Sequence, residues 1–166
     1  MASRATSPRV ARRPALQSEG PNPRECNRRA LVDTAVWTWA RDRRFPSLAV
    51  WFNDLARSGL VLVCDLVVLE LVRLAPNERR AQEMAALLAS FESVPMPGSL
   101  WQRSREVQLL LAATGDQRRV PPADLLIAAA AELACVPLMH HDRDYERIAD
   151  ATGQDHTWFV PDGALA

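Results

Sequence analysis

Short apolar runs alternate with longer amphipathic segments along this chain, a pattern typical of a sheet covered by helices. The runs at 30–32, 60–64 and 136–139 are short and almost wholly apolar, so they predict buried strands. A final strand is expected at 157–160 and a short extended piece at 94–96. Helices are expected at 34–42, 46–57, 67–74, 77–91, 100–113 and 145–151, and one more begins at Pro121 and Pro122. This alternation predicts an α/β fold with a mainly parallel sheet flanked by helices.

Two of these helices carry expectations about single side chains. Asp65 precedes the helix 67–74 and is expected to cap it, because Asp is a favoured N-cap residue. In the helix 77–91, four apolar side chains are spaced to face inward: Met84, Leu87, Leu88 and Phe91.

Composition places a boundary near residue 30. Residues 1–29 contain four prolines and scattered arginines without an apolar period, so a disordered basic tail is expected there. One folded domain is expected over 30–162, and 163–166 form a short C-terminal end. No apolar run is long enough to span a membrane, and three separated cysteines without CxxC spacing fit a reducing cytoplasm. All twenty basic residues are arginine, which excludes a catalytic lysine and a P-loop.

Four carboxylates stand where chemistry is possible. Asp33 and Asp142 follow predicted strands, and Asp124 lies in a first helical turn, where the helix dipole favours an anion. Capping or the dipole alone could explain each of these three. Glu70 is different, because it lies in the nearly unbroken apolar run 66–72 in the middle of a helix. An unpaired buried carboxylate is costly, so Glu70 is expected to reach water or a polar pocket.

Considered together, the four acids predict a divalent metal site. Parallel strands open into one crevice at their C-terminal ends, so Asp33 and Asp142 should point into it, with Glu70 and Asp124 on adjoining helices. Carboxylates in one pocket repel one another and raise each other's pKa values, a conflict that a divalent cation removes. Oxygen ligands without Cys or His favour Mg²⁺, for which Mn²⁺ could substitute. Such a site suits attack of water on a phosphodiester bond.

At these residues the chain resembles the PIN-domain ribonucleases, specifically the VapC-type toxins of bacterial type II toxin–antitoxin systems. The resemblance covers about residues 30–162. The matching pieces are LVDTAVW with Asp33, VVLELV with Glu70, PPADLLIAAAAEL with Asp124, and LMHHDRDYERIA with Asp142 and Asp144. None of these pieces is specific alone; their order and spacing carry the resemblance.

The resemblance implies a PIN-like three-layer sandwich and a Mg²⁺-dependent endoribonuclease toxin that hydrolyses RNA with a metal-activated water. It implies a catalytic quartet of Asp33, Glu70, Asp124 and Asp142. In this interpretation the metal is held by Asp33, Asp124 and Asp142, Glu70 orients the attacking water or a second ion, and Asp144 supports them. A homodimer and a small VapB-like antitoxin that inhibits the enzyme are also implied.

Two positions depart from the family's pattern. His140 stands where a small hydroxyl residue is common, and Ala35 stands where Ser is common. His140 could relay protons or contact phosphate, although a hydrogen-bonded wall residue is the favoured interpretation. His156 is expected at the surface. Arg118 and Arg119, on the loop before Asp124, could hold the RNA backbone or be solvated charges.

Two other function classes fit parts of the sequence. Asp142 and Asp144 form a DxD pair like that of a phosphotransferase with an Asp nucleophile, but no Thr follows and no lysine supports it. A catalytically silent PIN-like scaffold that only binds a partner protein would keep the fold. Such a scaffold would not need Glu70 on an apolar helix.

Overall fold

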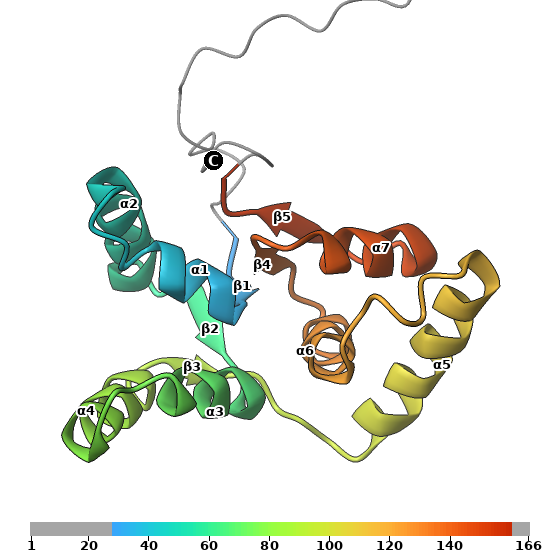
Figure 1. Cartoon of the computed structure of the whole chain (residues 1–166), viewed down its shortest axis with the longest axis horizontal. Helices are drawn as coiled ribbons and strands as arrows, with labels where there is room; N and C mark the ends of the chain where they lie inside the picture. The colour runs from blue at the N-terminus through green and yellow to red at the C-terminus, as the bar shows by residue number, and fades with distance from the viewer. Residues whose placement is uncertain (1–27, 161–166) are drawn as a thin grey trace, which may run out of the picture.

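Five parallel strands form one sheet in the order β3-β2-β1-β4-β5 (Figure 1). The computed structural model describes residues 28–160, so most of the predicted tail 1–29 and the end 163–166 lie outside the described residues. The strands are β1 (Ala30–Val32), β2 (Val61–Val63), β3 (Glu92–Ser93), β4 (Leu138–His140) and β5 (His156–Trp158). All four neighbouring pairs are parallel, as the alternation of strands and helices predicted.

Helices cover both faces of this sheet. They are α1 (Thr34–Trp39), α2 (Pro46–Arg57), α3 (Asp65–Arg73), α4 (Glu78–Leu88), α5 (Ser99–Thr114), α6 (Pro122–Leu133) and α7 (Arg143–Thr152). Helices α1 to α4 lie on one side and α5 to α7 on the other (Figure 1), which confirms the predicted three-layer α/β sandwich. Among residues 28–160, no helix combines the length and apolar character needed to cross a membrane.

The core contains the three middle strands and the buried face of α6. Every residue of β1, β2 and β4 is buried, as expected for central strands covered on both faces. Helix α6 packs against α3, α5 and α7. Its four consecutive alanines, 128–131, are all buried, because small side chains allow an enclosed helix to approach its neighbours closely.

The pairing of β1 with β4 sets the position of the site. In this pair Leu31 lies opposite Leu138 and Val32 opposite Met139, so both strands end at the same level. The chain leaves β1 toward β2 and β3 on one side, and β4 leads to β5 on the other. Such a reversal of strand order leaves a crevice beyond the C-terminal strand ends.

Several predicted boundaries and contacts were wrong in detail. Helix α3 begins at Asp65 with Cys64 as the N-cap and no side-chain capping bond, so Asp65 lies in the first turn and does not cap. Strand β3 precedes the predicted piece 94–96, although the Val94 N–H still donates to the Val63 carbonyl at 2.7 Å. Leu88 is buried as expected, whereas Leu87 is 47% exposed.

Ala130→Leu should lower the free energy of unfolding by about 1–3 kcal/mol, because the fully buried site has no room for three further carbon atoms. Urea unfolding followed by circular dichroism measures this. Ala112→Leu on an exposed position of α5 is the matched control and should change stability by less than about 0.5 kcal/mol. Equal stabilities of the two variants would contradict the tight packing of α6.

Candidate metal centre

Asp33 is fixed at the end of β1 by three hydrogen bonds. Its backbone N–H donates to the Met139 carbonyl of β4 at 2.9 Å, and its Oδ2 accepts the Ala35 N–H at 3.0 Å as the N-cap of α1. Its Oδ1 accepts the Tyr145 hydroxyl at 2.7 Å. The residue is only 5% exposed, so Asp33 is buried at the C-terminal end of β1.

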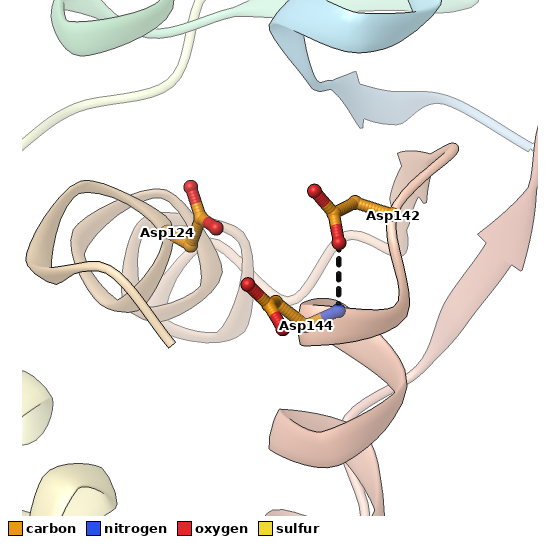
Figure 2. Close-up of side chains that lie close together, drawn as sticks. All are labelled: Asp124, Asp142 and Asp144. Atoms are coloured by element: carbon orange, nitrogen blue, oxygen red, sulfur yellow. Dashed lines mark hydrogen bonds between the residues drawn. The ribbon is translucent and has the colours of Figure 1, made fainter. Parts of the chain in front are cut away.

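Asp142 and Asp144 come from the turn between β4 and α7. Asp142 is the N-cap of α7, and its Oδ1 accepts the Asp144 N–H at 2.9 Å (Figure 2). The extended backbone of Asp142, with φ of −142°, lets its carboxylate turn back over the first turn of the helix. The Asp144 carboxylate forms an ion pair with Arg147, one turn further along α7.

Asp124 faces these two acids from the first turn of α6 (Figure 2). Carboxylate oxygens of Asp124, Asp142 and Asp144 all lie within 4.8 Å of one another, and we call these three residues the acidic cluster. Asp33 adjoins the cluster through Tyr145, whose hydroxyl is 3.5 Å from Asp124 Oδ1. Asp33 and the three residues of the acidic cluster, which are far apart in the sequence, therefore lie close together in the structure.

Glu70 is not part of the acidic cluster but lies nearby on α3. Its Oε2 accepts the Thr34 hydroxyl at 2.6 Å, and the side chain is half-buried. The expectation that Glu70 reaches a polar environment is therefore confirmed. Its negative charge contributes to the raised pKa of Asp124, which places it on the same side of the molecule as the cluster.

Three acids of this site, Asp33, Asp124 and Asp144, have raised pKa values and so hold their protons more tightly than ordinary carboxyl groups. Burial, followed by the charges of Asp33, Asp142, Asp144 and Glu70, raises the pKa of Asp124 to about 7. Burial also raises the pKa of Asp33, and burial together with Asp142 raises that of Asp144. Burial is the largest cause of each shift, and the repulsion between carboxylates that the sequence predicted adds to it.

The donor set fits a hard divalent cation. Carboxylate oxygens from three residues lie within a span that one ion can bridge, and no Cys or His contributes to the acidic cluster. Arg147 pairs with Asp144 and Asp116, and among the ion pairs of the described residues none involves Asp124 or Asp142. A divalent cation would replace the proton on Asp124 and balance the remaining charge.

The two histidines of the pattern form a buried pair beside the cluster. His140 Nδ1 accepts the Asp142 N–H at 3.2 Å, and its Nε2 lies 2.8 Å from His156 Nδ1. Burial, followed by the charge of His156, lowers the pKa of His140 to about 3, so its ring is neutral. This is the hydrogen-bonded wall residue that the sequence favoured. The expectation of a surface position for His156 was wrong, since it is half-buried against His140.

Two residues of the site were not identified from the sequence. Tyr145 was interpreted only as the start of a helix, and Thr34 only as a residue of α1. Their positions one residue after Asp144 and one after Asp33 were the available signal, because a polar side chain beside a site acid often supports it. Of the two arginines before α6, Arg119 pairs with Asp116 at 3.4 Å and Arg118 is exposed.

Comparison with known proteins identifies the family. The family model for the PIN domain matches residues 30–151. Ribonuclease VapC51 of Mycobacterium tuberculosis (strain ATCC 25618 / H37Rv) is 37% identical over 81% of this chain and 96% of its own length. The chain therefore belongs to the PIN domain family, among its VapC-type members.

Solved structures share the fold at lower identity. The chain in a DNA-bound VapBC from Salmonella typhimurium aligns with a TM-score of 0.63 at 17% identity, covering 80% of this chain and 99% of that one. VapBC-5 from Mycobacterium tuberculosis, a member of the VapBC family of toxin–antitoxin systems, aligns with a TM-score of 0.51 at 19% identity, covering 78% and 95%. These likenesses bear out the fold.

Asp124→Asn should stabilise the protein at pH 8 in EDTA. The pKa of Asp124 is about 7 in the folded protein and 3.8 in a model aspartate, so the folded state binds the proton more tightly. Wild-type stability should therefore fall as the pH rises through this window. Asparagine removes the charge, which should raise the free energy of unfolding at pH 8 by about 1–3 kcal/mol, allowing for solvent screening of a partly exposed group.

Urea unfolding at pH 4, 6 and 8 tests this dependence. The two proteins should be most alike at pH 4, where Asp124 is protonated in the folded state, and should diverge as the pH rises. Asp150→Asn, which changes an exposed acid of α7, is the matched control and should follow the wild type at every pH. Parallel curves for wild type and Asp124→Asn would contradict the raised pKa.

Proposed function

We propose that this PIN-domain protein is a Mg²⁺-dependent endoribonuclease that acts as the toxin of a toxin–antitoxin pair. The observation that carries the proposal is the acidic cluster, in which carboxylate oxygens from α6 and from the β4–α7 turn lie within 4.8 Å of one another. The ribonuclease name of a relative that aligns over most of its length supports the activity. The toxin–antitoxin assembly of a structural neighbour supports the biological role.

Asp33, Asp124 and Asp142 are the proposed metal ligands. Asp124 and Asp142 belong to the acidic cluster. Both oxygens of Asp33 already accept a hydrogen bond, but each carboxylate oxygen keeps a second lone pair that could bind an ion. Asp144, which the sequence predicted only as a supporting acid, has an oxygen close enough to join them.

A phosphodiester of RNA is the proposed substrate. When bound, Mg²⁺ would lower the pKa of the attacking water and balance negative charge on the phosphate. The protein's own contribution is to hold the carboxylates at fixed positions, within reach of one ion. Glu70, which accepts the Thr34 hydroxyl, is proposed to orient the water or a second ion. Because Asp33 is almost fully buried, a single-stranded or looped RNA reaches the crevice more easily than a duplex.

The alternative is a catalytically silent scaffold, and metal binding separates the two. Isothermal titration with Mn²⁺ should show saturable binding that Asp124→Asn removes. A scaffold would bind no Mn²⁺ and would lose nothing when its acids are replaced. The raised pKa of Asp124 argues against the scaffold. It shows that the ionised form of Asp124 is unfavourable in the folded protein, a cost that a bound cation would offset and that a silent scaffold would not need.

An apolar groove between α1, α3 and α4 is the proposed seat of the antitoxin. The groove has a volume of about 620 Å³, and its apolar lining includes Leu74 and Leu87, which are 56% and 47% exposed. Arg41 also lines it, donating to Met84 Sδ at 3.3 Å and lying 5.7 Å from the Trp37 ring centre. Within residues 28–160 no carboxylate forms an ion pair with Arg41, and burial lowers its pKa.

The chemistry of this groove specifies its occupant. Arg41 is exposed at the groove and forms no ion pair with a carboxylate of the described residues, so its guanidinium is available to a partner's carboxylate. We therefore propose an antitoxin segment that places apolar side chains between α3 and α4 and an acidic side chain on Arg41. A homodimer is also proposed, from the resemblance alone, and sedimentation velocity of the purified protein measures it.

Asp124→Asn should lower kcat/KM for cleavage of a labelled single-stranded RNA in Mg²⁺ by at least about a hundredfold. Loss of a residue behind a ligand costs about 10–100-fold, and loss of a ligand should cost more. EDTA should abolish wild-type cleavage and Mg²⁺ should restore it. Asp150→Asn, purified in the same way, should cleave like the wild type, which excludes a contaminating nuclease. Cleavage by Asp124→Asn at the wild-type rate would contradict the assignment.

Leu74→Arg and Leu87→Arg should reduce co-purification with the cognate antitoxin by at least about tenfold, because a charge enters an apolar contact. Arg41→Gln should weaken it less, since one ion pair is lost. Leu109→Arg on α5, where the side chain is 73% exposed outside the groove, is the matched control. All variants should cleave RNA like the wild type. Normal capture by both groove variants would contradict this seat.

A further inference from the structure

Tyr145 is the only tyrosine in the chain, and its hydroxyl lies among the acids of the metal centre. The residue belongs to the first turns of α7 and is 2% exposed. Its hydroxyl donates to Asp33 Oδ1 at 2.7 Å and lies 3.5 Å from Asp124 Oδ1. A polar atom this deeply buried has a defined role in holding its partners.

The hydroxyl links three elements that the sequence keeps far apart. Asp33 follows β1, Asp124 belongs to α6, and Tyr145 itself belongs to α7, whose N-cap is Asp142. The capping bond from Asp144 N–H to Asp142 fixes the first turn of α7. The phenol is therefore a rigid bridge from the Asp142 turn to the two acids on the other side of the crevice.

The phenol is the donor in this bridge, because an ionised carboxylate can only accept a hydrogen bond. The short bond to Asp33 orients that carboxylate, and the phenol oxygen stands between Asp33 and Asp124, 3.5 Å from Asp124 Oδ1, where it sets the spacing of the two acids. A phenylalanine would fill the same space without either effect.

We propose that Tyr145 is a positioning residue that holds Asp33 and Asp124 at the separation needed to bind the catalytic cation. This inference rests on the proposed metal-dependent function. Residues behind metal ligands fix the orientation of those ligands, and their removal weakens metal binding without removing a ligand. Tyr145 belongs to this class, since it contacts two acids and is not itself proposed as a ligand.

Tyr145→Phe isolates the hydroxyl, because the ring and its packing remain. Isothermal titration should show that Mn²⁺ binds about 10–100-fold more weakly to the variant than to the wild type. At saturating Mg²⁺, kcat for RNA cleavage should fall about tenfold while KM for RNA changes less than about threefold. Ser104→Ala is the matched control, because it removes another buried hydroxyl, one that bonds the Leu125 carbonyl and no carboxylate. It should bind Mn²⁺ like the wild type.

A spectroscopic readout does not depend on activity. Protein labelled with ¹³C at tyrosine Cζ gives one resonance, which Mg²⁺ should shift to saturation in the wild type but not in Asp124→Asn. A Mn²⁺ Kd of Tyr145→Phe within twofold of the wild type, or tighter, would overturn the role of Tyr145 while leaving the nuclease proposal standing. Absence of Mn²⁺ binding by the wild type would overturn both.

Discussion

Mutual repulsion between the carboxylates of one site is the main physical constraint on this structure. Five acids lie near one another at this site. Burial of Asp124, followed by the negative charges of the other four acids, raises its pKa to about 7. Arginines are plentiful in the chain, yet among the described residues only Arg147 pairs with a member of the acidic cluster. The protein thus maintains an unbalanced negative charge beyond the ends of β1 and β4, and a cation is the physical means of balancing it.

Three helix N-termini lie at these acids and stabilise their negative charge. Asp33 caps α1, Asp142 caps α7, and Asp124 lies in the first turn of α6. The positive end of each helix dipole favours an anion at these positions. Capping and metal binding are therefore compatible roles of the same side chains, and the ordinary structural explanation of each acid is also part of how the cluster is tolerated.

The sequence predicted the elements well and their ends less well. Apolar runs of three to five residues located β1, β2 and β4, because central parallel strands must be apolar on both faces. The edge strand β3 is exposed and has only two residues, Glu92 and Ser93, so no apolar run marked it. Asp65 looked like a cap because Asp is common there, but the cap residue Cys64 needs only its backbone to begin α3.

The same contrast holds at the site. Asp33 and Asp142 follow β1 and β4, and because these strands are parallel, both residues lie at the same edge of the sheet, as the sequence predicted. Asp124 lies in the first turn of α6, also as predicted. Contacts that depend on the rotamer of a side chain could not be predicted from the sequence pattern. Whether Tyr145 turns its hydroxyl to Asp33, or Thr34 turns its own to Glu70, depends on packing that periodicity does not encode.

His140 shows how a departure from the family's pattern is absorbed. A hydroxyl at that position would offer a small acceptor, whereas the imidazole offers Nδ1 to the Asp142 N–H and turns Nε2 toward His156. Burial and His156 lower the pKa of His140 to about 3, so the larger ring brings no positive charge to the crevice. With histidine at this position, the Asp142 N–H still has a hydrogen-bond acceptor, and the negative charge of the acids is unchanged. A protonated histidine at this position would have competed with the cation, and the paired neutral ring avoids that competition.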